Sequence, residues 1–151
     1  MMTHPDTLTL HAAPAAAGVT LTGGEGTDTL ATTYAAYNTI SGYGATDLAK
    51  ITGFETLSIT TAALANTNNV DLSKLAGLTS AQILGVAAAG AATISGVGAN
   101  SSVVIKGDID TDDGALTITL KDATGSSDVL NLTLNDLYTE NNDATAAVEA
   151  T

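Results

Sequence analysis

The stretch GGEGTDTLA at residues 23–31 decides the fold that we expect. It fits the nine-residue pattern G-G-x-G-x-D-x-U-x, where U is a large apolar residue, at every specified position. The glycines allow backbone conformations with positive φ and bring carbonyl oxygens close to an ion. Asp28 adds a hard anionic oxygen of the kind that Ca²⁺ prefers. After this turn, Leu30 is expected to point from a short strand into the core.

This pattern is typical of turns in parallel β-rolls that bind calcium, where each ion lies between two successive turns. One turn supplies only about half of the ~6–8 oxygen ligands that Ca²⁺ needs, and the chain contains a single intact copy. A glycine-rich turn with an aspartate also occurs as an ordinary β-turn, in which the carboxylate caps its own backbone. We favour calcium binding, and a purely structural turn stays open as the alternative.

Two later turns are weaker relatives of this pattern. The segment GYGATDL at residues 42–48 places Asp47 after two glycines. The segment GSSDVL at residues 125–130 places Asp128 before an apolar strand. Either aspartate could lie beside Asp28 and complete a coordination shell, although the spacing alone does not show it.

A third acidic segment, GDIDTDDG at residues 107–114, carries four carboxylates within six residues. Its alternating aspartates resemble the first half of a D-x-D-x-D-G calcium loop. The glycine comes one position late and Thr119 stands where such a loop needs Glu, so the segment is not an EF-hand. A calcium site and a solvated acidic turn are equally open, because these carboxylates repel one another unless they are solvated or bound to a cation. The candidate calcium ligands of all these turns are Gly23, Gly24, Gly26, Asp28, Asp47, Asp108, Asp110, Asp112 and Asp128.

The composition of the 151 residues favours a thin, stacked core. Hydrophobic residues make up 44% of the chain, but it has one Phe, four Tyr and no Trp. A compact globule usually relies on large aromatic side chains in its core. Small aliphatic residues stacked strand upon strand need none, so we expect a solenoid.

The charge balance excludes several partners. Sixteen acidic residues against four basic ones give a net charge of −12. Such a surface repels nucleic-acid phosphates and anionic membranes, and it attracts divalent cations. The chain has no cysteine, which excludes disulfides and thiolate metal sites.

Short strands rich in Thr, Val, Ile and Leu alternate with turns from residue 19 onward. The alternation of apolar and polar residues is clearest in LTITL at residues 116–120 and LNLTL at residues 130–134. A right-handed parallel β-helix or β-roll of the all-β class explains the pattern, and an antiparallel β-sandwich is the alternative. Residues 71–78 and 87–92 could form short helices. The strands are predicted at residues 19–22, 29–33, 56–60, 82–86, 93–95, 102–106, 116–120 and 129–134.

Three segments follow from this pattern. We expect a flexible N-terminal segment or linker at residues 1–18, a β-solenoid domain at 19–137, and an acidic tail or the start of a further repeat at 138–151. The first residues lack the basic and apolar regions of a secretory signal peptide. The longest apolar run is shorter than the ~20 residues of a membrane span.

Three phrases carry a resemblance to a known family: GVTLTGGEGTDTL at residues 18–30, ITGFETLSIT at 51–60 and ITLKDATGSSDVLNLTL at 118–134. Their order resembles the β-solenoid repeats of bacterial S-layer proteins and related type I-secreted RTX surface proteins, which carry hemolysin-type calcium-binding repeats. The resemblance covers about residues 19–137. The tandem nonapeptides of that family are absent here.

The resemblance implies a non-catalytic structural module at the bacterial cell surface, outside the cell, that folds with Ca²⁺. It further implies self-association into a lattice, or contact with neighbouring repeats of a longer chain, with a cell-surface polysaccharide as another partner. No nucleic acid and no membrane insertion are expected.

Catalysis is not expected, because the chain has four Lys and no Arg to recognise an acidic sugar. Two other functions stay open: an adhesin module that binds glycan or a host surface, and an accessory domain of a secreted enzyme. Tyr34, Tyr37 and Tyr43 lie close in sequence and would offer such an adhesin a stacking platform, or shield an end of the solenoid.

Overall fold

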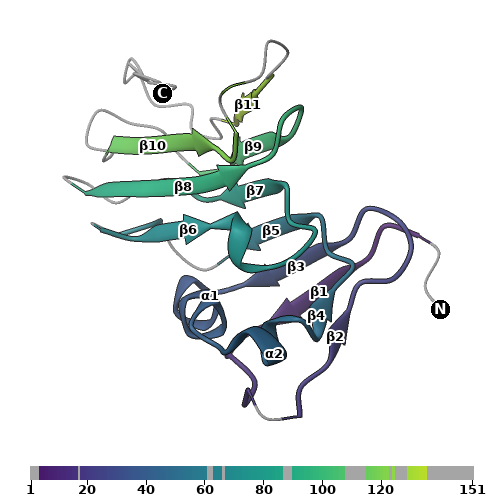
Figure 1. The fold of residues 1–151 in the computed structure, drawn as a ribbon. Coiled ribbons are helices and arrows are strands. Elements are labelled where there is room, and N and C mark those ends of the chain that lie inside the picture. Colours follow the sequence, from purple (N-terminus) through teal and green to yellow (C-terminus); the bar gives the residue numbers. More distant parts are fainter. Residues whose placement is uncertain are drawn as a thin grey trace.

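The structure, a computed structural model, describes residues 4–16, 18–60, 63–65, 67–86, 90–107, 115–122, 124 and 129–135. It is mostly β, with parallel sheets and few, short helices (Figure 1). Every strand pair in these ranges is parallel, which agrees with the all-β class and contradicts the antiparallel sandwich. Among the described residues, no helix is long and apolar enough to cross a membrane.

The largest sheet has six strands, and it contains every second strand of the eleven in the described part of the chain. Their order in the sheet is their order in the sequence, so each connection between neighbours crosses over and returns to the same side. The strands pair in register: Thr7 lies beside Thr29, and Thr29 beside Thr56. The members are β1 (Thr7–Leu10), β3 (Thr29–Thr32), β5 (Thr56–Ile59), β7 (Ser80–Ile83), β9 (Ser102–Ile105) and β11 (Asn131–Leu134).

The intervening strands form two smaller parallel sheets. One contains β6 (Asn69–Asp71), β8 (Ala91–Val97) and β10 (Ala115–Leu120). The other contains β2 (Leu21–Thr22) and β4 (Ile51–Thr52). Each crossover of the large sheet therefore contributes to a second layer.

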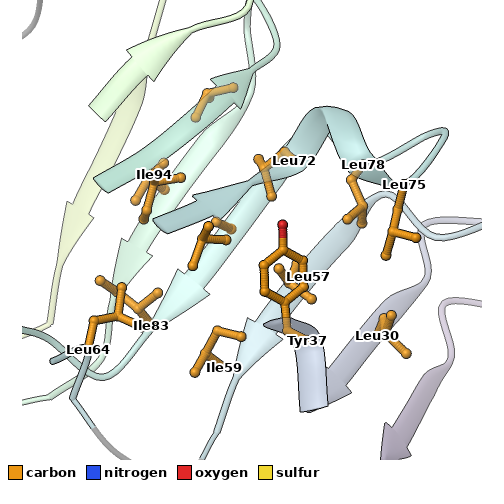
Figure 2. Packing of buried hydrophobic residues seen from close by; sticks show 14 of the residues in the cluster. Leu30, Tyr37, Leu57, Ile59, Leu64, Leu72, Leu75, Leu78, Ile83 and Ile94 are labelled. Atoms are coloured by element: carbon orange, nitrogen blue, oxygen red, sulfur yellow. The ribbon is translucent and has the colours of Figure 1, made fainter. Parts of the chain in front are cut away.

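The core is made mostly of aliphatic side chains, together with Tyr37 and Phe54, and Figure 2 shows part of this cluster. In the large sheet, Leu30, Leu57 and Val103 stand in register with one another and are fully buried. In the three-stranded sheet, Val70 and Ile94 do the same. This stacking explains how the chain builds a core with so few aromatic residues.

Helix α1 (Tyr34–Ser41) replaces a strand at one end of the three-stranded sheet. Helix α1 follows β3 along the chain, at the place where strand β6 follows β5. Thr33 caps the helix, because its side chain accepts a hydrogen bond from the Ala36 N–H. The Tyr37 hydroxyl donates to the Asp71 carbonyl at 2.7 Å, and the Tyr34 hydroxyl accepts from the Asn69 N–H at 3.1 Å. Both partners belong to β6, so α1 covers the edge of that strand (Figure 1).

Some of the expected elements differ from the observed ones. Strand β1 lies within residues 1–18, where a flexible segment or linker was expected, and pairs with β3. The sequence did not predict α1, nor α2 (Ala45–Leu48). Of the two predicted helices, one reduces to the 3₁₀ turn η1 (Leu72–Lys74), and residues 91–92 of the other belong to β8.

Candidate functional site

The carboxylate of Asp28 is fully buried just before β3. Its Oδ1 atom accepts a hydrogen bond from the backbone N–H of Asp6 at 2.8 Å. Its Oδ2 atom is buried and has no hydrogen-bond partner among the described residues. A buried polar atom without a partner costs about 1–3 kcal/mol, so this oxygen marks a place where a ligand atom would stabilise the fold.

Glu55 holds the equivalent position before β5. Its Oε2 atom accepts a hydrogen bond from the Asp28 N–H at 2.8 Å, and the Asp28 carbonyl accepts from the backbone N–H groups of Glu55 and Thr56 at 3.1 Å. Asp6 holds the same position before β1. Asp6, Asp28 and Glu55 therefore form one acidic column across three adjacent strands.

Neighbouring strands lie about 4.8 Å apart, so the carboxylates of the acidic column repel one another unless a cation or proton neutralises them. The neighbouring hydrogen bonds are donated by the backbone and leave this repulsion in place. A cation at Asp28 would relieve this repulsion.

Glycines allow the turns at this column to approach closely. A Cβ atom on Gly23 would lie 1.8 Å from the Gly53 carbonyl oxygen and 2.7 Å from the Asp28 Cβ. Gly24 and Gly26 have φ values of 114° and 136°, which only glycine adopts readily. The predicted positive φ is therefore observed at Gly24 and Gly26, and the predicted role of the glycines in holding an ion stays a prediction.

The residues present fit a calcium ion in two respects: a buried carboxylate oxygen lacks a partner, and the Gly53 carbonyl oxygen lies close to Gly23 on the side of Asp28. The described ranges contain no group of three or more His, Cys, Asp or Glu side chains arranged to hold a metal. Asp28 and Glu55 would therefore supply the carboxylates, and peptide carbonyls or water the remaining oxygen ligands.

The other predicted ligands are not brought to Asp28 in the described part of the chain. Asp47 lies in α2, where its Oδ1 pairs with Lys50 Nζ at 2.7 Å. This ion pair already neutralises its charge. Asp108, Asp110, Asp112 and Asp128 lie outside the described residues.

Tyr37 cannot take part in a stacking platform, because its side chain is buried, whereas Tyr34 and Tyr43 are half-buried. Tyr37 is 1% exposed. Burial raises the pKa of its hydroxyl well above the ordinary value, although the hydrogen bond to the Asp71 carbonyl acts in the opposite direction. The Tyr43 hydroxyl donates to the Pro14 carbonyl. These contacts fix the helical end of the molecule, which agrees with the shielding role.

Asp6 and Glu55 were not among the predicted ligands, yet the sequence carries a signal for them. The same tripeptide pattern, an acid followed by Thr and Leu, occurs at residues 6–8, 28–30 and 55–57. The repeats are 22 and 27 residues apart, so a search at one fixed period misses them.

Comparison with known proteins gives no relative to guide the assignment: no family model, no curated protein and no solved structure matches the chain.

Proposed function

We propose that this chain is a non-catalytic structural module of a secreted bacterial surface-layer protein, folded as a right-handed parallel β-solenoid and stabilised by Ca²⁺ at the acidic column. The strand order supports the solenoid, because each crossover returns to the next parallel position. Parallel crossovers are nearly always right-handed.

The buried, unpartnered Oδ2 atom of Asp28 carries the calcium part of the proposal. Where calcium is scarce, as in the cytosol, the acidic column repels itself and opposes pairing of β1, β3 and β5. Outside the cell, the ion neutralises Asp28 and Glu55 and ties β3 to β5, while β1 is held to the site by the Asp6 N–H, which donates to the Asp28 carboxylate. An ion that binds only the folded state adds about 2.7 kcal/mol of stability at a hundredfold excess over its Kd.

The distribution of charge supports a structural role. The six strands of the large sheet contain no charged residue, although the chain has a net charge of −12. In the described part of the chain, the acids next to this sheet, Asp6, Asp28 and Glu55, stand just before its strands, and the strands themselves are left to pack. The phrases shared with surface-layer and RTX proteins support an extracellular location and self-association.

A calcium titration of the thermal melt tests the proposal. We expect circular dichroism in excess EGTA to show a low melting temperature that rises with Ca²⁺ and much less with Mg²⁺. Asp28→Asn should remove most of this rise, because it keeps the shape of the side chain and loses its charge. Asp47→Asn is the matched control and should respond as the wild type does. An unchanged calcium response in Asp28→Asn, or no response in the wild type, would refute the ion site.

A further inference from the structure

The large sheet ends in two strands, β1 and β11, that pair on one side only within the described ranges. These strands lie at opposite ends of the ladder (Figure 1). Among the described residues, side chains in line with the core become more exposed at the β11 end: Leu134 is 39% exposed, whereas Ile59 and Ile83, in the same column of side chains, are 2% and 1% exposed. Val129, just before β11, is 50% exposed.

The backbone of β11 offers hydrogen-bonding groups on its unpaired side. Asn131 and Asn135 donate their N–H groups to the carbonyls of Ser101 and Ile105. Because successive residues of a strand direct their backbone groups to opposite sides, Leu132 and Leu134 direct theirs away from β9.

The backbone of β1 offers the complementary groups. The Asp6 carbonyl accepts from the Thr29 N–H at 2.8 Å, so even-numbered residues of this segment face β3. By the same alternation, Thr7 and Thr9 direct their N–H and C=O groups to the unpaired side. The two ends of the sheet can thus form one more parallel ladder.

The side chains of the two strands match as well. The sequence of β11 is NLTL and that of β1 is TLTL. In-register parallel pairing would place Leu8 beside Leu132 and Leu10 beside Leu134, which continues two columns of the core. Neither strand carries a charge, so no two charged side chains would face each other within the new ladder, and both strands lack the charged residues that commonly block edge strands.

We propose that a second copy of this chain docks head to tail, with β1 of one copy adding to β11 of the other as the next parallel strand. This inference rests on the proposed solenoid and names its partner and contact. The two surfaces in such a contact differ, so the association repeats and forms open-ended chains of copies. The exposed Leu134 becomes buried at each junction.

Sedimentation velocity of the folded chain in Ca²⁺, over a range of concentrations, tests the contact. We expect the wild type to grow beyond dimers. Thr9→Pro removes an N–H group from the unpaired side of β1, and Leu134→Lys places a charge in the column at the other end. Each substitution should raise the dissociation constant of the contact by at least about tenfold. Thr9→Pro leaves a carbonyl of the neighbouring β11 without its hydrogen-bond donor, and Leu134→Lys puts a charge beside Leu10 of the next copy. Thr133→Lys, an equal change of charge on the exposed neighbouring residue, is the control and should still associate.

Mixing the two variants tests the direction of docking. Each variant keeps one intact end, so an equimolar mixture should form dimers and nothing larger. Dimers of Thr9→Pro alone would show β11 pairing with itself and overturn the head-to-tail contact, as would a folded wild type that stays monomeric at every concentration. A monomer that still responds to calcium refutes only this inference, whereas association without a calcium response refutes only the ion site.

Discussion

The large sheet has an acidic half and a neutral half, which differ at one position of each turn. The residue before the strand is Asp6, Asp28 or Glu55 in the acidic half, and Thr79 or Ser101 before β7 and β9 in the neutral half. The backbone ladder is the same in both. The Ser80 N–H donates to the Glu55 carbonyl, and the Asn131 N–H to the Ser101 carbonyl. Strand pairing therefore does not require a carboxylate. In the acidic half, the carboxylates of Asp28 and Glu55 also accept hydrogen bonds from the backbone N–H groups of Asp6 and Asp28, and we propose that they bind the cation as well.

Close approach of glycine to a neighbouring turn is common to both halves. A Cβ on Gly23 would lie 1.8 Å from the Gly53 carbonyl oxygen, and a Cβ on Gly107 would lie 1.8 Å from the Leu84 carbonyl oxygen. Glycine thus allows close approach of turns in both halves, and the acids distinguish the half that we propose to respond to calcium.

Gly23→Ala should give the largest effect on stability. We expect a loss of about 3 kcal/mol, because the added methyl group must push two packed turns apart. Urea denaturation measures this loss in EGTA. Gly107→Ala should cost a similar amount, and Gly44→Ala, where no atom lies within 4 Å, should be nearly neutral. Gly23→Ala should also lose the stabilisation that calcium gives the wild type, whereas Gly107→Ala should keep it. Equal calcium responses in these two variants would contradict the distinction between an acidic and a neutral half.

The second sheet has its own contrast, between β6, whose edge α1 covers, and β10 at the other end. Tyr37→Phe removes the buried hydrogen bond to the Asp71 carbonyl and should cost about 1 kcal/mol at pH 7. Since burial raises the pKa of Tyr37 in the folded state, its stabilisation is complete below the unfolded value of about 10 and is lost as the pH rises above it. Urea denaturation between pH 7 and 11 should therefore show a less steep alkaline loss in Tyr37→Phe. Tyr34→Phe, on the same helix and less buried, is the control. If stability falls with pH as steeply in Tyr37→Phe as in the wild type, the Tyr37 hydroxyl does not cause the alkaline loss.

The strands could be predicted from the sequence because burial on one face imposes alternation. The segment LTITL at residues 116–120 shows it plainly and lies within β10. Helix α1 could not be predicted, because its eight residues bury only three side chains and its place at the edge of β6 decides its conformation. Asp28 was found through its glycines. Its partner Glu55 was missed because the crossovers differ in length, and only the assembled register shows which acids are neighbours.

Thr79→Glu would extend the acidic column into the neutral half, and we expect the smallest effect from it. Thr79 is exposed and its N–H already donates to the Glu55 carbonyl, so a carboxylate there joins the column without disturbing the ladder. In EGTA the variant should lose less than about 1 kcal/mol through repulsion, as is usual for exposed charges. In calcium it should recover this loss, because one more carboxylate faces the ion. Thermal melts with and without Ca²⁺ measure the loss of stability in EGTA and its recovery in calcium. Thr79→Gln is the control, because its side chain has the same shape as Glu and no charge. If the Glu and Gln variants melt alike in both conditions, the column exerts no electrostatic influence on β7, and the ion's effect ends at Glu55.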